Sequence, residues 1–360
     1  MHVLVDASIL KPGLGGIATY AEGIVRDLAG REGVRVSVAT SCPERITGLP
    51  GVDVVALPAA VRSFGRRLLW RERSLAALTR RVGADVVFAV TIELPLRKLP
   101  VPSLVVVHDV GPLAAPELYG RARRARFRLL LGPVLRRASA IACVSAATRG
   151  ALLERYADLA SRTVVVREGP RIAPTTPWAP TDPPYVLYVG PLLAHKNVDT
   201  LIAAFGEPAL DGVTLRIAGF VSDRDRDGML RRAAAGGAGV EHVGAVTDAE
   251  LARLYAGARA VALPSLHEGF GLPLLEALAA GAPVVASAID AHREVAGLGA
   301  ILVERSRDPR AWAAALASCV ADPDSQRSRS ADAVRARVAH YTWQGAGDDV
   351  LDQLGALVAG

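Results

Sequence analysis

Residues 263–287 read LPSLHEGFGLPLLEALAAGAPVVAS and hold the most informative pattern of the chain. The apolar start predicts a buried strand that ends at Ser265, and the glycine-rich HEGFG that follows predicts a loop. A helix is expected to begin near Leu272, because the proline at position 273 suits a first helical turn. The segment AAGAPVVAS then closes the helix and starts the next strand. The stretch therefore predicts one strand–loop–helix–strand unit of an α/β domain with a parallel sheet.

The loop and the opening turns of this helix combine glycines with two carboxylates, Glu268 and Glu276. Loop glycines let backbone N–H groups approach an anion, and the helix N-terminus adds a partial positive charge. One bound molecule that spans a sugar, a diphosphate and a ribose could be held by both glutamates. Two glutamates at a fixed spacing are common, however, and by themselves they favour solvated acids on a plain strand–loop–helix.

The same alternation of short apolar runs and helical patterns continues along all 360 residues. It predicts two α/β units in tandem, each with a parallel sheet. Helices are predicted at 17–29, 66–82, 121–137, 308–320, 324–339 and 343–358. Strands are predicted at 2–7, 34–39, 52–57, 84–90, 103–109, 140–145 and 163–168 in the first half, and at 185–190, 213–219, 240–244, 258–265, 282–287 and 300–304 in the second.

A proline-rich window at 170–185 separates the two series. Its six prolines cannot lie inside a helix or a central strand, so an interdomain linker is predicted at 171–184. The expected domains are residues 1–170 and 185–342. The helix at 343–360 is expected to pack back on the first domain.

Composition bounds the class of protein. With 51% hydrophobic and 22% charged residues, the chain can bury a core in each of two domains. Its three cysteines, Cys42, Cys143 and Cys319, are widely separated, which fits a reducing cytoplasm better than a disulfide scaffold or zinc site. The N-terminus MHVLVDASIL lacks the basic residues of a signal peptide, and no apolar run approaches ~18 residues. A cytoplasmic protein is expected, at most peripheral on the inner face of the membrane.

Charge is distributed unequally, with +12 for residues 1–175 and −6 for residues 176–360. Arginines accompany apolar residues in two helical patterns, 61–81 and 119–139. These patterns leave two interpretations open: a surface that touches anionic membrane or a phosphorylated acceptor, and an arginine-rich solvated face on core helices. No nucleic-acid partner is expected, because no recognised nucleic-acid module accompanies the charge.

Several motifs in one order carry a resemblance to a known family. They are GGIATY (15–20), VVVHD (105–109), CVSAATR (143–149), LYVGPLLAHKN (187–197), the run 242–271 that ends in EGFG, and a final helix after HYTW (340–343). Together with EGFGLPxxEALAxGxPVV, they resemble the retaining glycosyltransferases of family 4 (glycosyl transferases group 1), mannosyltransferase-like. This resemblance covers nearly the whole chain.

The resemblance implies the GT-B fold, an α/β architecture of two Rossmann-like α/β/α domains with parallel sheets facing a central cleft. It implies that the first domain binds an acceptor and the second a nucleotide-sugar donor. A hexose would pass from a nucleotide diphosphate sugar, GDP-mannose favoured and UDP-sugar possible, with retention of configuration. The receiving hydroxyl would belong to a glycan, a lipid-linked or a phosphorylated small-molecule acceptor.

The resemblance also assigns catalytic roles to three residues. Glu268 would face the donor sugar and help to hold the developing oxocarbenium ion. Lys196 would neutralise the leaving diphosphate, and His108 would support the sugar from the first domain. No general base is named, because the leaving phosphate is expected to take the acceptor's proton.

Further residues would bind the donor. Glu276 would accept hydrogen bonds from the ribose hydroxyls, and amides of the glycine loops would contact phosphate or sugar. The expected donor-binding residues are Gly15, Gly16, Asp109, His195, Gly269, Phe270, Gly271, Leu272 and Glu276. His195 departs from the family pattern, where an arginine is usual, and Pro191 stands where some members have another arginine, so the diphosphate would meet fewer fixed charges. No metal and no cofactor are expected; SDRDRD (222–227) is predicted to be a solvated loop.

Three rival functions are compatible with parts of the sequence. Gly13, Gly15 and Ala18 match the GxGxxA pattern of NAD and FAD enzymes, but the glycines do not follow the first strand directly, and no carboxylate ends the second. The altered His195 and Pro191 are the best support for a donor-binding scaffold or regulatory protein without turnover. A nucleotide-sugar epimerase is the remaining alternative, and product analysis would separate it from a transferase.

Overall fold

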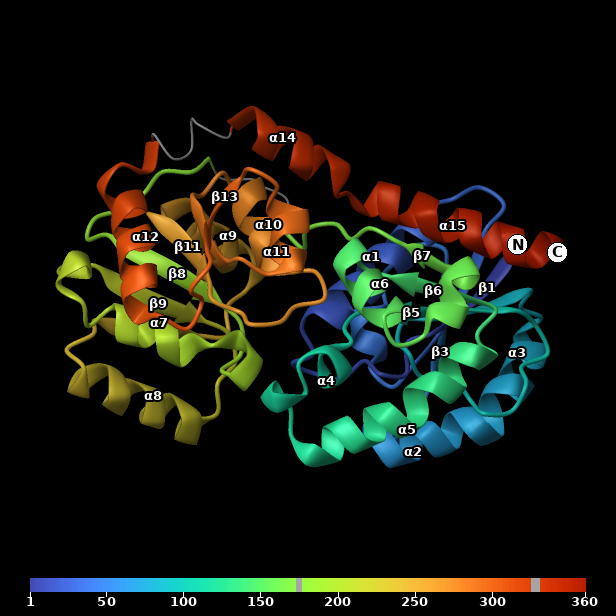
Figure 1. Cartoon of the computed structure of the whole chain (residues 1–360). Coiled ribbons are helices and arrows are strands. Elements are labelled where there is room, and N and C mark those ends of the chain that lie inside the picture. Colours follow the sequence, from blue (N-terminus) through green and yellow to red (C-terminus); the bar gives the residue numbers. More distant parts are fainter. Residues whose placement is uncertain (173–176, 325–330) are drawn as a thin grey trace. The chain divides into compact units, whose positions relative to one another are not determined.

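The computed structural model of the chain describes residues 1–172, 177–324 and 331–360. The chain divides into two compact units. Unit 1 comprises Met1–Gly169 and Tyr341–Gly360, and unit 2 comprises Pro170–His340. Each unit is an α/β layer structure around one parallel sheet (Figure 1).

The sheet of unit 1 has seven parallel strands in the order β3-β2-β1-β4-β5-β6-β7. The strands are β1 (His2–Asp6), β2 (Arg35–Thr40), β3 (Val52–Ala56), β4 (Val86–Ala89), β5 (Ser103–Val107), β6 (Ala140–Cys143) and β7 (Thr163–Val165). β1 lies between β2 and β4, with Val5 beside Val38 on one side and Phe88 on the other. The strand order therefore reverses between β1 and β4, and such a switch point is where a crevice for ligands opens at the carboxyl edge of a parallel sheet.

Helices cover both faces of this sheet. They are α1 (Gly16–Ala29), α2 (Phe64–Trp70), α3 (Ala76–Val82), α4 (Gly111–Ala114), α5 (Arg121–Arg137), α6 (Ala146–Leu153) and α15 (Trp343–Ala359), with short turns η1 (Pro43–Arg45), η2 (Ala59–Arg62), η3 (Arg71–Leu75), η4 (Pro116–Leu118) and η5 (Ala157–Arg162). Leu78 of α3 packs on Leu4, and Leu135 of α5 belongs to the core cluster of Val105. Figure 1 shows α2, α3 and α5 together on one face of the sheet and α1 with α15 on the other face.

The C-terminal helix α15 packs closely on α1, and two glycines permit the approach. A Cβ atom at Gly23 would lie 2.4 Å from the ring of Trp343, and one at Gly347 would lie 1.7 Å from Oδ2 of Asp27. Arg167, which follows β7, donates to both carboxylate oxygens of Asp349 at 2.8 Å. The end of the chain is thus part of unit 1.

Unit 2 repeats the plan with six parallel strands in the order β10-β9-β8-β11-β12-β13. The strands are β8 (Tyr185–Val189), β9 (Thr214–Ala218), β10 (Val240–Gly244), β11 (Ala260–Leu263), β12 (Val284–Ser287) and β13 (Ala300–Val303). The order reverses between β8 and β11, which pair through Val186 and Ala260. A second switch point therefore lies between these two strands.

The helices of unit 2 are α7 (Val198–Ala204), α8 (Asp223–Ala235), α9 (Asp248–Gly257), α10 (Leu272–Ala279), α11 (Asp290–Ala296), α12 (Pro309–Ala321) and α14 (Ala331–His340), with short turns η6 (Ala194–Lys196) and η7 (Pro208–Leu210). The prediction of a solvated loop at 222–227 is wrong. Ser222 accepts a hydrogen bond from the backbone N–H of Asp225 and caps α8, whose first turn holds Asp223 and Asp225. Acids are favourable in a first helical turn, so the segment begins a helix.

The predicted linker differs from the structure in its second part. Residues 173–176 lie outside the described residues. Beyond them, Ala179 and Thr181 donate backbone hydrogen bonds to Ala256 and Gly257, and the Trp178 indole donates to the carbonyl of Ala258. Residues 178–181 are therefore bonded to the C-terminal end of α9 and belong to unit 2. Residues 325–330 of the predicted helix 324–339 also lie outside the described part of the chain.

Candidate active site

The switch point of unit 2 brings together the two loops that carry the predicted charges. The loop after β8 leads to Lys196, and the loop after β11 leads to Glu268. The backbone N–H of Leu266 donates to the carbonyl of His195 at 2.8 Å, which joins the two loops. His195, Lys196 and Glu268 are therefore neighbours at the carboxyl edge of the sheet.

Lys196 and Glu268 form an ion pair, with Nζ 2.5 Å from Oε1. Their side chains are only 17% and 14% exposed. Asn197 adopts the left-handed conformation (φ 53°) directly before α7, a conformation that asparagine tolerates better than most residues. The Ser265 hydroxyl donates to the same Glu268 oxygen at 2.6 Å. One carboxylate oxygen thus receives two donors.

Three groups set the protonation of Glu268. Burial by itself would raise its pKa, but the charge of Lys196, the nearby His292 and the hydrogen bonds from Lys196 and Ser265 outweigh it, and the pKa falls below its usual value. Burial lowers the pKa of His292, whose Nδ1 lies 3.0 Å from the carbonyl of Ser287. Its Nε2 has no partner among the described residues.

Sequence reasoning missed Ser265 and His292. Ser265 stands three residues before Glu268 in the quoted motif, so its place at the end of the strand was a usable signal. No local pattern marks His292, because it reaches the loop from α11.

The glycine loop has the backbone that the motif predicts. Gly271 has φ +101°, and a Cβ atom there would lie 3.3 Å from Cδ2 of His292, so the position is suited to glycine. Helix α10 begins at Leu272 with proline in its first turn, as predicted. Phe270 is only 4% exposed, so its side chain belongs to the core and only its backbone is suited to contact a ligand. Gly269 and Gly271 are buried with it.

Glu276 lies on α10 and is 6% exposed. The Tyr255 hydroxyl donates to its Oε2 at 2.9 Å. Burial raises the pKa of Glu276 to about 7, although Tyr255 and the charge of Arg171 oppose the shift. No local pattern marks Tyr255 or Arg171, because both come from other segments.

In unit 1, His108 and Asp109 follow β5 at the carboxyl edge. His108 Nε2 donates to the carbonyl of Val90 at 2.8 Å, and Nδ1 lies 3.6 Å from Oε1 of Glu168. Burial raises the pKa of Glu168, with His108 opposing the shift. Asp109 accepts from the backbone N–H of Gly111. Unit 1 itself therefore fixes the orientation of both predicted side chains.

The glycine loop after β1 is exposed at Gly15 and Gly16. A Cβ atom at Gly15 would meet no atom within 4 Å, so packing does not require glycine there. Tyr20, one turn into α1, is buried and packs edge-on against the His108 ring at 4.9 Å between ring centres. This agrees with a packing role for Tyr20.

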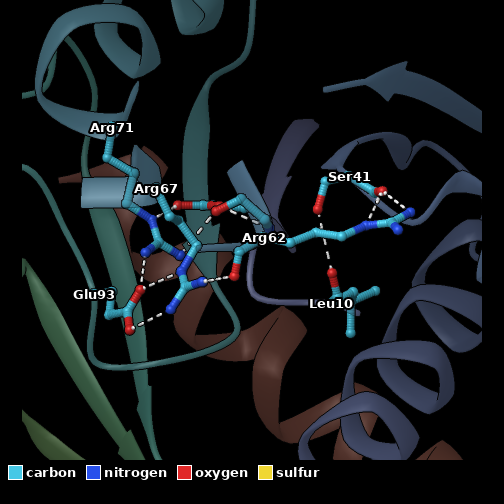
Figure 2. A network of polar contacts seen from close by, with 8 residues as sticks. Leu10, Ser41, Arg62, Arg67, Arg71 and Glu93 are labelled. Carbon is cyan, nitrogen blue, oxygen red and sulfur yellow. Dashed lines mark hydrogen bonds and ion pairs between the residues drawn. The ribbon is translucent and has the colours of Figure 1, made fainter. Parts of the chain in front are cut away.

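A buried ion network that the sequence did not predict lies beneath the same edge (Figure 2). Arg71 is fully buried, donates to Asp6 at 2.5 Å and pairs with Glu93. Arg67 donates to both Glu93 oxygens, at 2.8 and 3.1 Å. Arg71 lies in η3, a π-helical turn between α2 and α3. Such turns often occur at functional sites.

The predicted basic segment 61–81 is only partly a charged surface. Arg67 and Arg71 are buried and paired, so they are not part of a charged surface. Phe64 and Trp70 in the same pattern are half-buried. In the described part of the chain, no helix has the length and apolar character needed to cross a membrane.

Comparison with protein families gives two matches in tandem. Residues 14–170 match the model described as Glycosyltransferase Family 4, and residues 176–336 match Glycosyl transferases group 1. The curated relatives include O-antigen chain mannosyltransferase B of Escherichia coli, 27% identical over 66% of this chain and 66% of the relative. D-inositol 3-phosphate glycosyltransferase of Xylanimonas cellulosilytica is 36% identical over 48% of this chain. The matches span 66% and 42% of these relatives' own lengths.

Solved structures share the fold over nearly the whole chain. Sucrose-phosphate synthase from Thermosynechococcus elongatus has a TM-score of 0.82 at 22% identity, covering 99% of both chains. HepE from Anabaena, in complex with UDP and glucose, has a TM-score of 0.74 at 19% identity, covering 99% of this chain and 100% of that one. At these identities the likeness concerns the fold. The family matches and the fold agree, and the chain belongs to the family 4 and group 1 glycosyltransferases of the GT-B fold.

Proposed function

We propose that the protein is a retaining hexosyltransferase that uses a nucleotide diphosphate sugar as donor. The observation that carries this proposal is the Lys196–Glu268 pair at the switch point of unit 2. A cation there suits a diphosphate, and a carboxylate beside it suits sugar hydroxyls and a developing positive charge. Membership of the glycosyltransferase family supports the same reaction class.

In this proposal, binding of the donor breaks the Lys196–Glu268 ion pair. The diphosphate competes with Glu268 for Lys196, so its arrival frees the Glu268 carboxylate to accept hydrogen bonds from the hexose. Lys196 then stabilises the negative charge that grows on the leaving diphosphate. The leaving phosphate oxygen takes the proton of the acceptor hydroxyl as the new glycosidic bond forms on the same face. No enzymic nucleophile and no metal take part.

Glu276 is proposed to bind the ribose. Its carboxylate is buried near the donor loop and already accepts one hydrogen bond from Tyr255. The free lone pairs of an ionised carboxylate match the two hydroxyls of a ribose. Further backbone contacts to the donor would come from the glycine loop of unit 2, at Gly269, Phe270, Gly271 and Leu272. Unit 1 would add donor contacts from Gly15, Gly16, His108 and Asp109.

GDP-mannose is the favoured donor, with a UDP-sugar as the alternative. The Escherichia coli relative, a mannosyltransferase, supports the first, and the UDP and glucose bound to HepE support the second. The acceptor is proposed to be a glycan, a lipid-linked or a phosphorylated small molecule. A cytoplasmic location and a peripheral membrane contact remain predictions.

A donor screen followed by product analysis tests this function. Thermal shift with GDP-mannose, GDP-glucose, UDP-glucose and UDP-N-acetylglucosamine should show one preferred donor, since a bound ligand stabilises the fold by mass action. NMR of the product formed from that donor should show the donor's anomeric configuration retained, with an unchanged rate in EDTA. An inverted product would refute the retaining mechanism, a rate abolished by EDTA would refute metal independence, and isomerised sugar without transfer would indicate an epimerase.

A further inference from the structure

A pocket of about 700 Å³ opens in unit 1 beside His108 and Asp109. Its walls come from α2, α5 and the loops that follow β1, β4 and β5, and it is called the α2–α5 pocket below. Its volume lies within the range of roughly 300–1,000 Å³ that is typical of small-molecule sites. The proposed function uses only His108 and Asp109 of its lining.

Much of this pocket is apolar. Its lining includes Phe64 and Leu69 of α2, Phe127 and Leu130 of α5, and Leu96 from the loop after β4. Leu69 and Leu96 are 47% and 46% exposed, so two large apolar side chains at the pocket are left uncovered. A wall of this kind gains free energy by covering an apolar chain, whereas a free sugar or free phosphate leaves it in contact with water.

Two cations of α5 stand at the same pocket. The Arg126 guanidinium lies 4.2 Å from the centre of the Phe64 ring, and Arg123 lies 4.8 Å from that of Tyr119. Neither arginine forms an ion pair with a carboxylate in the described part of the chain. Stacking on a ring holds a guanidinium in place and leaves its N–H groups able to bind an anion.

The lining holds five cations against three acids, Glu72, Glu93 and Asp109, and each acid has partners of its own. Asp109 accepts from the backbone N–H of Gly111 and from the Tyr119 hydroxyl. Glu93 is paired with Arg67 and Arg71. Glu72 accepts from the backbone N–H of Leu96 at 2.7 Å and lies 3.4 Å from Arg97. The charge left over at the pocket is therefore positive, which favours an anionic ligand.

An independent observation points to a ligand inside the pocket. Thr91 follows β4, lines the pocket and is only 6% exposed. Its Oγ1 is buried and has no hydrogen-bond partner among the residues that the structure describes. A buried hydroxyl without a partner costs stability, and a ligand oxygen in the pocket would supply the missing bond.

We propose that the α2–α5 pocket binds the acceptor, and that the acceptor is an amphiphilic phosphate, in which an alkyl or isoprenyl chain is joined to a phosphate group. The apolar wall covers the chain, and Arg123, Arg126 and Thr91 bind the phosphate. The receiving hydroxyl then belongs to a sugar attached to this phosphate, beside His108. This inference rests on the proposed function, because it names the acceptor class of that reaction.

Calorimetric titration of the full chain with dodecyl phosphate, below its micelle concentration, tests the proposal. Inorganic phosphate supplies the charge without the chain, and dodecyl maltoside supplies a chain and a sugar without the charge. We expect dodecyl phosphate to bind at least tenfold more tightly than either. Vesicles of phosphatidylcholine with phosphatidic acid separate a lipid surface from a single amphiphile.

Variants on one helix locate the site. The double variant Arg123→Gln/Arg126→Gln should weaken dodecyl phosphate binding about tenfold or more, as charged hydrogen bonds are lost. Arg128→Gln removes the same charge from an exposed position of α5 outside the pocket and should leave the affinity unchanged. Thr91→Val replaces the unpaired hydroxyl by a methyl group, and we expect an undiminished melting temperature with several-fold weaker binding. Thr91→Val also keeps the test decisive if the double variant fails to fold.

The outcomes separate the two proposals. Equal affinity for dodecyl phosphate and dodecyl maltoside, or binding to vesicles alone, would overturn the amphiphilic phosphate in this pocket. Unchanged binding in both the arginine and the Thr91 variants would overturn it as well. GDP and UDP are titrated in the same samples: nucleotide binding that persists leaves the proposed donor site standing, and its absence from the unmodified chain counts against the proposed function instead.

Discussion

Glu268 and Glu276 stand eight residues apart, yet their pKa values shift in opposite directions. Burial raises both, but Glu268 has Lys196 at 2.5 Å and its pKa ends below the usual value. At Glu276 burial dominates and raises the pKa to about 7, although the Tyr255 hydroxyl and the charge and backbone hydrogen bond of Arg171 oppose the shift. The environment thus keeps one carboxylate ionised and lets the other titrate near neutrality.

This difference predicts a pH dependence of donor binding. Ribose hydroxyls bind the ionised Glu276, which becomes the main form only above a pKa of about 7. The affinity for GDP or UDP should therefore rise about tenfold from pH 6 to pH 8. Because the pKa is raised in the folded state, the stability that protonated Glu276 provides is complete below pH 4.5, the ordinary value, and is lost as the pH rises through about 7.

Calorimetry of nucleotide binding at several pH values provides the check. A Glu276→Gln variant reports the part of the pH dependence that belongs to the diphosphate itself. The pH dependence measured for the variant is subtracted from that of the unmodified chain, and the remaining increase in nucleotide affinity is assigned to Glu276. The affinity for 2′-deoxynucleotides should increase less with pH. The same slope in the variant and the unmodified chain would disprove the assignment.

Arg71 makes a separate prediction about stability. It is fully buried between the carboxylates of Asp6 and Glu93. Arg71→Leu would leave Asp6 buried without its cation, and should lower the free energy of unfolding by about 3–5 kcal/mol in urea denaturation. Arg73→Leu, at an exposed position two residues along, is the matched control and should change it little. Equal effects of the two substitutions would contradict the stabilising role of the network.

Among the elements, α15 offers a comparison of two glycines on one helix. A Cβ atom at Gly347 would lie 1.7 Å from Oδ2 and 2.4 Å from Cγ of Asp27 on α1, whereas one at Gly355 would meet nothing within 4 Å. Gly355→Ala should therefore stabilise the protein by roughly 0.5–1 kcal/mol through helix propensity alone.

Gly347→Ala should do the opposite, because the new methyl group forces α15 away from α1. Differential scanning calorimetry should show a lower melting temperature for Gly347→Ala and a higher one for Gly355→Ala. A higher melting temperature for both would mean that α15 does not pack on α1 as described.

Most elements could be predicted because their signals are local. All thirteen predicted strands are present, and helix α5 has the predicted bounds, since apolar runs, prolines and glycines mark such elements in the sequence. The glycine loop with Glu268 and Glu276 was likewise readable from one segment. Arg71, Thr91 and His292 were not, because their roles depend on partners from other segments and on burial that no single stretch of sequence encodes.

Local patterns give the wrong expectation in two places. SDRDRD alternates charges and looked like a loop, but a serine followed by acids is equally a helix start, and α8 begins there. The basic pattern at 61–81 looked like a charged surface, yet the π-helical turn η3 contains Arg71, which is buried beneath the sheet edge.

At the level of the whole molecule, each unit has a switch point with its own chemistry. Unit 2 combines a cation, two buried glutamates and a glycine loop between β8 and α10, which suits a nucleotide diphosphate sugar. Unit 1 has a pocket with apolar walls and arginines beside the fixed side chain of His108, which suits an acceptor. The net charge also differs between the two halves, with +12 for residues 1–175 and −6 for residues 176–360.

The central claim is that Lys196 and Glu268 form the donor site, and paired measurements of nucleotide binding and hexose transfer test it most directly. Glu268→Gln should lower the transfer rate by about 10²-fold or more. It should leave GDP or UDP binding equal or tighter, because the competitor for Lys196 is gone. Lys196→Ala should weaken nucleotide binding about tenfold and lower the transfer rate as well. Wild-type transfer rates in both variants would contradict the account.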